Sequence, residues 1–138
     1  MSQPPLILVV DDEPSMRDLV LEVLEAEGYA VAAAHNGQQA LDFLQRVCPD
    51  AVVLDLMMPV LDGWAFMERY REVAGAEIPV LGVSAAMRPE LAERLNQLGV
   101  RACLAKPFDI AELLECVARA VRGMEPTAQR TALAEASR

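Results

Sequence analysis

Five short apolar runs, each followed by a stretch with helical spacing, constrain the fold of this 138-residue chain more than any other feature of its sequence. Continuous apolar runs of this length are typical of strands that are buried on both faces of a parallel sheet. The predicted strands are 6–10, 29–34, 51–54, 78–83 and 100–104. The alternation predicts an α/β fold, in which right-handed crossovers place helices on both faces of a five-stranded, doubly wound parallel sheet.

The segments between these runs carry apolar residues three and four positions apart, which is the spacing of one helix face. The predicted helices are 15–27, 38–46, 63–73, 89–98 and a last one that Asp109 caps and that ends near Arg122. Gly28 is expected to end the first helix as a C-terminal cap. We expect one domain over 1–122 and a flexible tail over 123–138, because the tail contains few large apolar residues.

Polar residues follow four of the five predicted strands. Asp11 and Asp12 come after the first strand, Asp55 after the third, Ser84 after the fourth and Lys106 at the end of the fifth. In a doubly wound sheet, ligands bind outside the carboxyl ends of the strands. We therefore expect these side chains to lie together at that edge of the sheet.

Three carboxylates at one edge would repel each other, at a cost of roughly 4 kcal/mol for two charges about 4 Å apart near a protein surface. Oxygen ligands without a histidine or thiolate cluster favour Mg²⁺ over zinc. A magnesium ion together with Lys106 would balance the charges of Asp11, Asp12 and Asp55. In the simpler alternative, the acids are solvated loop residues or caps at helix N-termini.

A carboxylate beside a metal ion and a lysine can attack phosphorus, because the cations neutralise the oxygens of the transferring group. Asp55 is the best candidate for this nucleophile, since its strand leads directly into it and Asp11 and Asp12 are better placed to bind metal. The hydroxyl of Ser84 could donate a hydrogen bond to a phosphoryl oxygen. The added negative charge would draw Ser84 and Lys106 inward and move their loops.

Four motifs carry a resemblance to a known family. They are "VVDDEP" (9–14), "VVLDLMMPVLDG" (52–63), "VLGVSA" (80–85) and "LAKPF" (104–108). In this order and at these intervals, the sequence resembles the receiver domains of bacterial two-component response regulators over about residues 5–122. The resemblance implies a flavodoxin-like, CheY-like (βα)5 fold with strand order 2-1-3-4-5.

The resemblance also assigns roles to the acidic residues. Asp55 would be the phosphoacceptor, and Asp12 and Asp55 would bind Mg²⁺ directly. Asp11 would act largely through water. The backbone carbonyl of Met57 would complete the protein ligands of the metal.

Further roles follow from the resemblance for the fourth and fifth strands. Ser84 would be the hydroxyl switch, and Lys106 would contact the phosphoryl group, with a cis peptide bond expected between Lys106 and Pro107. The family usually has Tyr or Phe three residues before this lysine, where Cys103 stands here. A thiol cannot fill the volume of that ring, so any signal is expected to leave the site through smaller shifts of the fourth helix, fifth strand and fifth helix.

The implied function is a phosphorylation-activated switch that takes its phosphoryl group from a sensor histidine kinase or a histidine phosphotransfer protein. Such a domain catalyses its own phosphorylation and dephosphorylation and is not an enzyme acting on another substrate. The change would be relayed to a downstream protein through the fourth helix, fifth strand and fifth helix. With no further domain after Arg122, the chain is expected to act by docking, either as a stand-alone domain or as a fragment of a longer regulator.

Three other functions fit these motifs less well. A receiver-like interaction module that is never phosphorylated would have lost an acid, the hydroxyl or the lysine, and none is lost. An aspartyl phosphatase usually has a second Asp two residues after the first, where Met57 stands. A flavin electron carrier would need a phosphate-binding loop after the first strand, whereas Asp11 and Asp12 would repel a phosphate.

Composition excludes some partners. The net charge of −9 and the pI of about 4.5 disfavour direct binding to nucleic acid or to anionic membranes. No apolar run reaches about 18 residues, and no signal peptide is recognised. Cys48, Cys103 and Cys116 form no C-x-x-C pair and are interpreted as reduced core or near-core residues of a cytoplasmic protein. His35, beside Asn36 and Gly37, is expected to be an exposed turn residue without a catalytic role.

Overall fold

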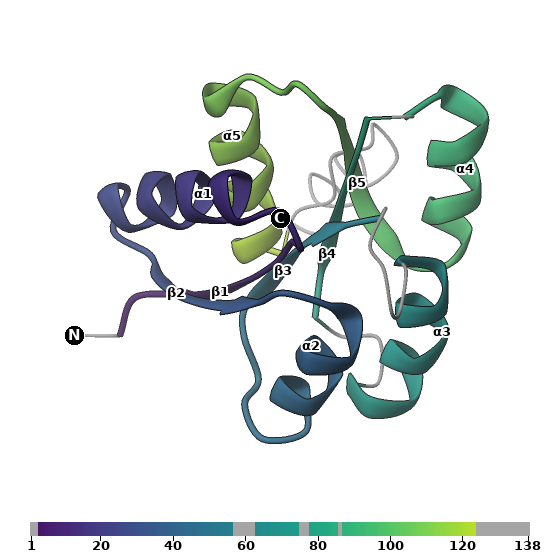
Figure 1. The fold of residues 1–138 in the computed structure, drawn as a ribbon, viewed down its shortest axis with the longest axis horizontal. Coiled ribbons are helices and arrows are strands. Elements are labelled where there is room, and N and C mark those ends of the chain that lie inside the picture. Colours follow the sequence, from purple (N-terminus) through teal and green to yellow (C-terminus); the bar gives the residue numbers. More distant parts are fainter. Residues whose placement is uncertain (1–2, 57–62, 75–77, 86, 124–138) are drawn as a thin grey trace, which may run out of the picture.

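The computed structural model describes residues 3–56, 63–74, 78–85 and 87–123. Five parallel strands form one sheet in the order β2-β1-β3-β4-β5. Helices α1 and α5 lie on one face of the sheet, and α2, α3 and α4 lie on the other (Figure 1). The predicted fold class and the strand order implied by the resemblance are both confirmed.

The helices and strands lie within two residues of their predicted bounds. The strands are β1 (Leu6–Val10), β2 (Ala30–Ala34), β3 (Ala51–Asp55), β4 (Val80–Ser84) and β5 (Val100–Ala105). The helices are α1 (Pro14–Ala26), α2 (Gly37–Leu44), α3 (Gly63–Ala74), α4 (Pro89–Gln97) and α5 (Ile110–Val121). Asp109 caps α5 as predicted, because its side chain accepts a hydrogen bond from the backbone N–H of Ala111.

The two strands that begin later than predicted have local causes. Gly28 adopts a φ of +97° after α1, and the N–H of Tyr29 donates to the carbonyl of Leu24. Tyr29 is therefore part of the helix stop, a Schellman arrangement, and β2 begins one residue later. Pro79 has no N–H to donate to a neighbouring strand, so β4 begins at Val80.

Alternate residues of each strand enter two separate cores. One core lies beneath α1 and α5, and its members include Val9 of β1, Val53 of β3 and Leu113 of α5. The other lies beneath α2, α3 and α4, and its members include Leu8 of β1 and Leu54 of β3. Because apolar packing holds both faces of the sheet, the ends of its strands have fixed positions.

None of the helices in the described part of the chain combines the length and apolar character needed to cross a membrane.

Candidate phosphoryl and metal site

The carboxyl ends of four strands place polar groups at one edge of the sheet. Asp55 is the last residue of β3, and Ser84 is the last residue of β4. Asp11 directly follows β1, and Lys106 directly follows β5. Asp55 lies opposite Val83 and Ser84 lies opposite Ala105 in the parallel register, so these strand ends are level with one another.

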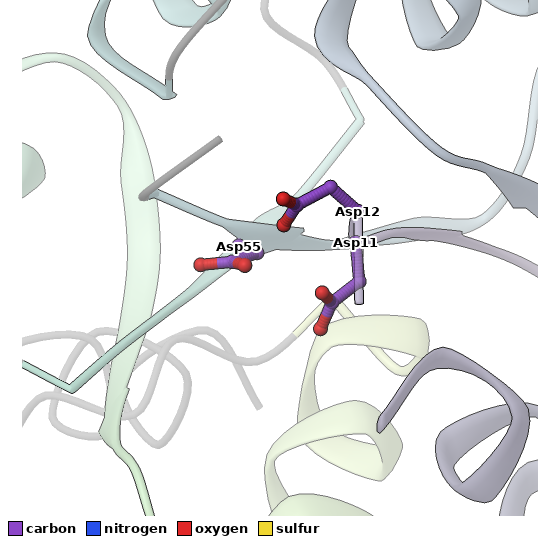
Figure 2. Close-up of side chains that lie close together, drawn as sticks. All are labelled: Asp11, Asp12 and Asp55. Atoms are coloured by element: carbon purple, nitrogen blue, oxygen red, sulfur yellow. The ribbon is translucent and has the colours of Figure 1, made fainter. Parts of the chain in front are cut away.

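The three predicted acids converge. One oxygen from each of Asp11, Asp12 and Asp55 lies within 4.8 Å of the other two. Asp11 and Asp55 are buried, each about 5% exposed, whereas Asp12 is exposed. Figure 2 shows Asp11 and Asp12 turned to opposite sides of the end of β1, with Asp55 next to them at the end of β3.

Lys106 supplies a positive charge to the two buried acids. Its Nζ lies 3.4 Å from Oδ2 of Asp11 and 3.4 Å from Oδ2 of Asp55. One ammonium cannot balance three carboxylates, and charges about 4 Å apart near a surface interact by roughly 4 kcal/mol. The described residues thus leave an excess of negative charge at the position where a cation would be bound.

The donor set fits magnesium. It consists of carboxylate oxygens, which are hard ligands, and the cluster contains no thiolate or imidazole that would favour zinc. Mg²⁺ usually keeps several waters when one or two carboxylates bind it, which suits a site with one exposed acid. Met57, whose carbonyl was expected to be a further ligand, lies outside the described residues.

Backbone hydrogen bonds connect the strand ends around the cluster. The N–H of Lys106 donates to the carbonyl of Ser84 over 3.0 Å, and the N–H of Leu56 donates to the carbonyl of Val83 over 3.0 Å. Ser84 itself is about 1% exposed. The peptide bond between Lys106 and Pro107 is cis, as expected.

The turn that carries the acid pair is held by contacts that the sequence did not reveal. The N–H of Glu13 donates to Oδ1 of Asp11 over 2.9 Å. The Glu13 carboxylate accepts from the N–H groups of Ser15 and Met16 and so caps α1. The helix cap among these acids is therefore Glu13 and not Asp11 or Asp12. Its position before Pro14, which stands at the first helical position, is a sequence signal for such a cap.

Capping also changes the acidity of Glu13. The hydrogen bond from the N–H of Met16, followed by that from Ser15, lowers the pKa of this carboxyl below its ordinary value of 4.5. The negative charge of Glu13 is thus stabilised by the helix and does not depend on a metal ion. Glu13 therefore needs no cation, and the charges left for a cation to balance are those of Asp11, Asp12 and Asp55.

Arg17 is a second contributor that sequence reasoning missed. Its Nη1 donates to the backbone carbonyl of Asp11 over 3.0 Å, and its own N–H donates to the carbonyl of Glu13 over 2.9 Å. The side chain is half-buried. Arg17 therefore contacts the chain on both sides of Asp12.

The three cysteines are free thiols in different environments. Cys48 is exposed, which makes its predicted near-core position wrong, because it lies in the loop between α2 and β3. Cys103 and Cys116 are half-buried and pack against the two cores. Burial raises the pKa of the Cys103 thiol to about 11 and also raises that of Cys116. His35 is exposed in a bend, as predicted.

Cys103 and Cys116 line the same surface groove. It has a volume of about 340 Å³ and lies between α4 and α5, over the edge of β5. Ala92 and Ala102 also line it, together with larger residues such as Asn96 and Glu112. Position 103, where the resemblance leads us to expect Tyr or Phe, is occupied by the thiol of Cys103.

A comparison with models of known protein families gives a match over most of this chain. The model described as the response regulator receiver domain matches residues 7–118. Among curated proteins, the response regulator MprA of Mycobacterium avium is 39% identical over 122 residues, which cover 87% of this chain and 52% of MprA. The chain thus spans about half the length of that relative.

Solved structures show the same architecture. The receiver domain of the Francisella response regulator 1452 matches with a TM-score of 0.81 and 30% identity, over 86% of this chain and 97% of that one. The receiver domain of the sensor histidine kinase PA1611 from Pseudomonas aeruginosa matches with a TM-score of 0.78 and 31% identity, over 86% and 98% of the two chains. That structure has a magnesium ion coordinated in its active-site cleft.

Proposed function

The chain belongs to the family of response regulator receiver domains, and on that premise we propose that it is a signalling switch controlled by phosphorylation of Asp55. The observation that carries the proposal is the convergence of three carboxylates and one lysine at a single edge of the sheet. A binding module without phosphoryl chemistry has no need for this costly arrangement of charge.

The proposed reaction is a phosphoryl transfer from a phosphohistidine to Asp55. A carboxylate oxygen of Asp55 attacks phosphorus, and the bond between phosphorus and the histidine nitrogen breaks. The electron pair of that bond leaves with the nitrogen of the donor. We propose a sensor histidine kinase or a histidine phosphotransfer protein as the donor, because both present such a phosphoramidate.

The residues around Asp55 have distinct parts in this proposal. The ammonium of Lys106 already lies 3.4 Å from Asp55 and would bind a phosphoryl oxygen as negative charge develops there. The hydroxyl of Ser84 would donate a hydrogen bond to another oxygen. Asp11, Asp12 and Asp55 would hold Mg²⁺, with the Met57 carbonyl as a further ligand, and the ion would neutralise the oxygens of the transferring group.

The reverse chemistry restores the starting state. Water attacks phosphorus, the acyl phosphate bond breaks, and inorganic phosphate leaves the Asp55 carboxylate. The chain would therefore catalyse its own phosphorylation and dephosphorylation. Its signal would pass to a downstream protein through the surface of α4, β5 and α5, where Cys103 permits smaller movements than a ring.

The proposal is tested by intact-protein mass spectrometry after incubation with Mg²⁺ and acetyl phosphate. We expect the mass of one phosphoryl group to be added, stable in acid and labile in base. Asp55→Asn should abolish the addition, while Asp42→Asn, which removes an exposed acid on α2, should retain it. If neither acetyl phosphate nor a cognate kinase adds mass to the wild-type protein, it is a receiver-like interaction module that is not phosphorylated.

A further inference from the structure

We infer that Arg17 is a positioning residue for the proposed magnesium site, holding Asp12 within reach of Asp11 and Asp55. The inference rests on the proposed function, since it concerns the same metal site. Arg17 does not belong to the acidic cluster, and the proposed phosphoryl transfer does not use it. Its part would be to fix the conformation of the chain that carries the acids.

The three acids differ in how they are held. Asp11 is fixed by the contact of Oδ2 with Lys106 and by the hydrogen bond of Oδ1 with the N–H of Glu13. Asp55 is the last residue of a strand that pairs on both sides and also contacts Lys106. Asp12 is exposed and lies beyond the end of β1. Its position depends on the backbone around it.

The Arg17 side chain holds that backbone on the side of Asp11. Its guanidinium donates to the carbonyl of Asp11, which belongs to the peptide bond that leads into Asp12. The N–H of Arg17 donates to the carbonyl of Glu13, the residue that follows Asp12, but this is the first backbone hydrogen bond of α1 and does not depend on the side chain. Since Glu13 also caps α1, the short turn that carries Asp12 is attached to the first turns of this helix by three separate contacts.

Repulsion among the three acids explains why Asp12 needs a contact that holds it in position. Three carboxylates within 4.8 Å repel one another, and the exposed acid can relieve the repulsion by turning away. A guanidinium on the carbonyl of Asp11 opposes this movement in two ways, through its hydrogen bond and through its positive charge. Positive charge is scarce in this part of the chain. Positions 1–62 contain 11 of the 21 acids but only two arginines, Arg17 and Arg46, and no lysine.

The matched variants are Arg17→Met and Arg46→Met. Both remove one positive charge from the same half of the sequence and give the same net charge, but Arg46 is exposed on the loop after α2. Arg17→Lys keeps the charge and the ability to donate a hydrogen bond but loses the planar guanidinium. Magnesium affinity is measured by isothermal titration calorimetry at a temperature at which circular dichroism shows every variant to be folded.

We expect Arg17→Met to raise the Kd for Mg²⁺ about tenfold, which is the effect typical of residues that orient metal ligands. Arg17→Lys should recover part of the affinity, and Arg46→Met should bind Mg²⁺ as the wild type does. With acetyl phosphate, Arg17→Met should raise the Mg²⁺ concentration needed for half-maximal phosphorylation while leaving the rate at saturating Mg²⁺ unchanged. If Arg17 only stabilised α1, Arg17→Met would lower the Tm but would not raise the Mg²⁺ concentration needed for half-maximal phosphorylation.

Two results for the wild type and Arg17→Met would overturn the inference, and they are distinguishable. If the wild type binds Mg²⁺ and Arg17→Met binds it equally well, Arg17 has no positioning role although the proposed function stands. If the wild type gives no heat of binding with Mg²⁺, the metal site of the proposed function fails and the inference fails with it. Should Arg17→Met not fold, Arg17→Lys decides the question, because an unchanged Kd there overturns the role of the guanidinium.

Discussion

The ammonium nitrogen of Lys106 lies 3.4 Å from Oδ2 of Asp55, and the same nitrogen lies 3.4 Å from Oδ2 of Asp11. One cation is thus shared between the two buried acids of the cluster. Asp12, the exposed acid, is part of the cluster without sharing this ammonium in the described contacts. The stability of the protein should therefore respond in opposite directions to the loss of the lysine and to the loss of the exposed acid.

Lys106→Met removes the cation and leaves three carboxylates together. In EDTA, we expect urea denaturation to show a free energy of unfolding lower by about 1 kcal/mol, a modest value because the side chain is partly exposed. Saturating Mg²⁺ should stabilise this variant more than the wild type. An unchanged free energy of unfolding would mean that Lys106 contributes nothing to the balance of charge.

Asp12→Asn removes one of the repelling charges without breaking an ion pair to Lys106. In EDTA, the variant should be more stable than the wild type, by less than about 1 kcal/mol because solvent screens exposed charges. Its Tm should also rise less when Mg²⁺ is added. Asp18→Asn, which removes an exposed acid from α1 outside the cluster, is the control and should change neither quantity. A lower Tm for Asp12→Asn in EDTA would contradict the prediction.

The Glu13 cap should make a contribution to stability that depends on pH. Because the folded-state pKa of this carboxyl is lowered, its contribution is complete above the ordinary value of 4.5 and is lost as the pH falls through the lower folded value. Glu13→Gln keeps an oxygen that can accept hydrogen bonds but does not titrate. The difference in Tm between the wild type and Glu13→Gln should be constant near neutral pH and should decrease below pH 4.5. A constant difference down to pH 3 would exclude the charge of the cap as its cause.

The thiols should react at different rates. The pKa of Cys103, raised to about 11, leaves very little thiolate at neutral pH, and burial acts in the same direction on Cys116. Iodoacetamide at pH 7.5 should label the exposed Cys48 first, with the other two labelled only after unfolding in urea. Peptide mass spectrometry identifies the modified residue. Rapid labelling of Cys103 in the folded protein would show that its thiol is accessible and acidic.

The fold could be predicted because the signal is repeated along the chain. The strands are mainly apolar runs, interrupted in β5 by Arg101, and the cores on the two faces of the sheet explain why residues on both faces of a strand are apolar. The errors of one or two residues occur where hydrogen bonds decide the boundary. Tyr29 is attached to the end of α1 by its N–H, and Pro79 lacks the N–H that would extend β4, so neither boundary follows from hydrophobicity.

The acidic cluster and its lysine could be predicted from the topology, since parallel strands bring their carboxyl ends to one edge. The parts that were missed depend on side-chain direction. Nothing in the spacing of Arg17 shows that its guanidinium returns to the carbonyl of Asp11. Cys48 was misplaced because an apolar neighbourhood in sequence, such as Val47, says little about burial in a loop that itself lies at the surface.

The hydrogen bond that the N–H of Lys106 donates to the carbonyl of Ser84 couples the end of β4 to the end of β5. The hydroxyl and the ammonium belong to neighbouring strands, yet the backbone from which each extends cannot shift alone without stretching that bond. A rearrangement of one loop would therefore be transmitted to the other, and the side chains of Ser84 and Lys106 would respond together to an incoming charge. The exchange rate of the Lys106 amide proton reports directly on whether this link opens.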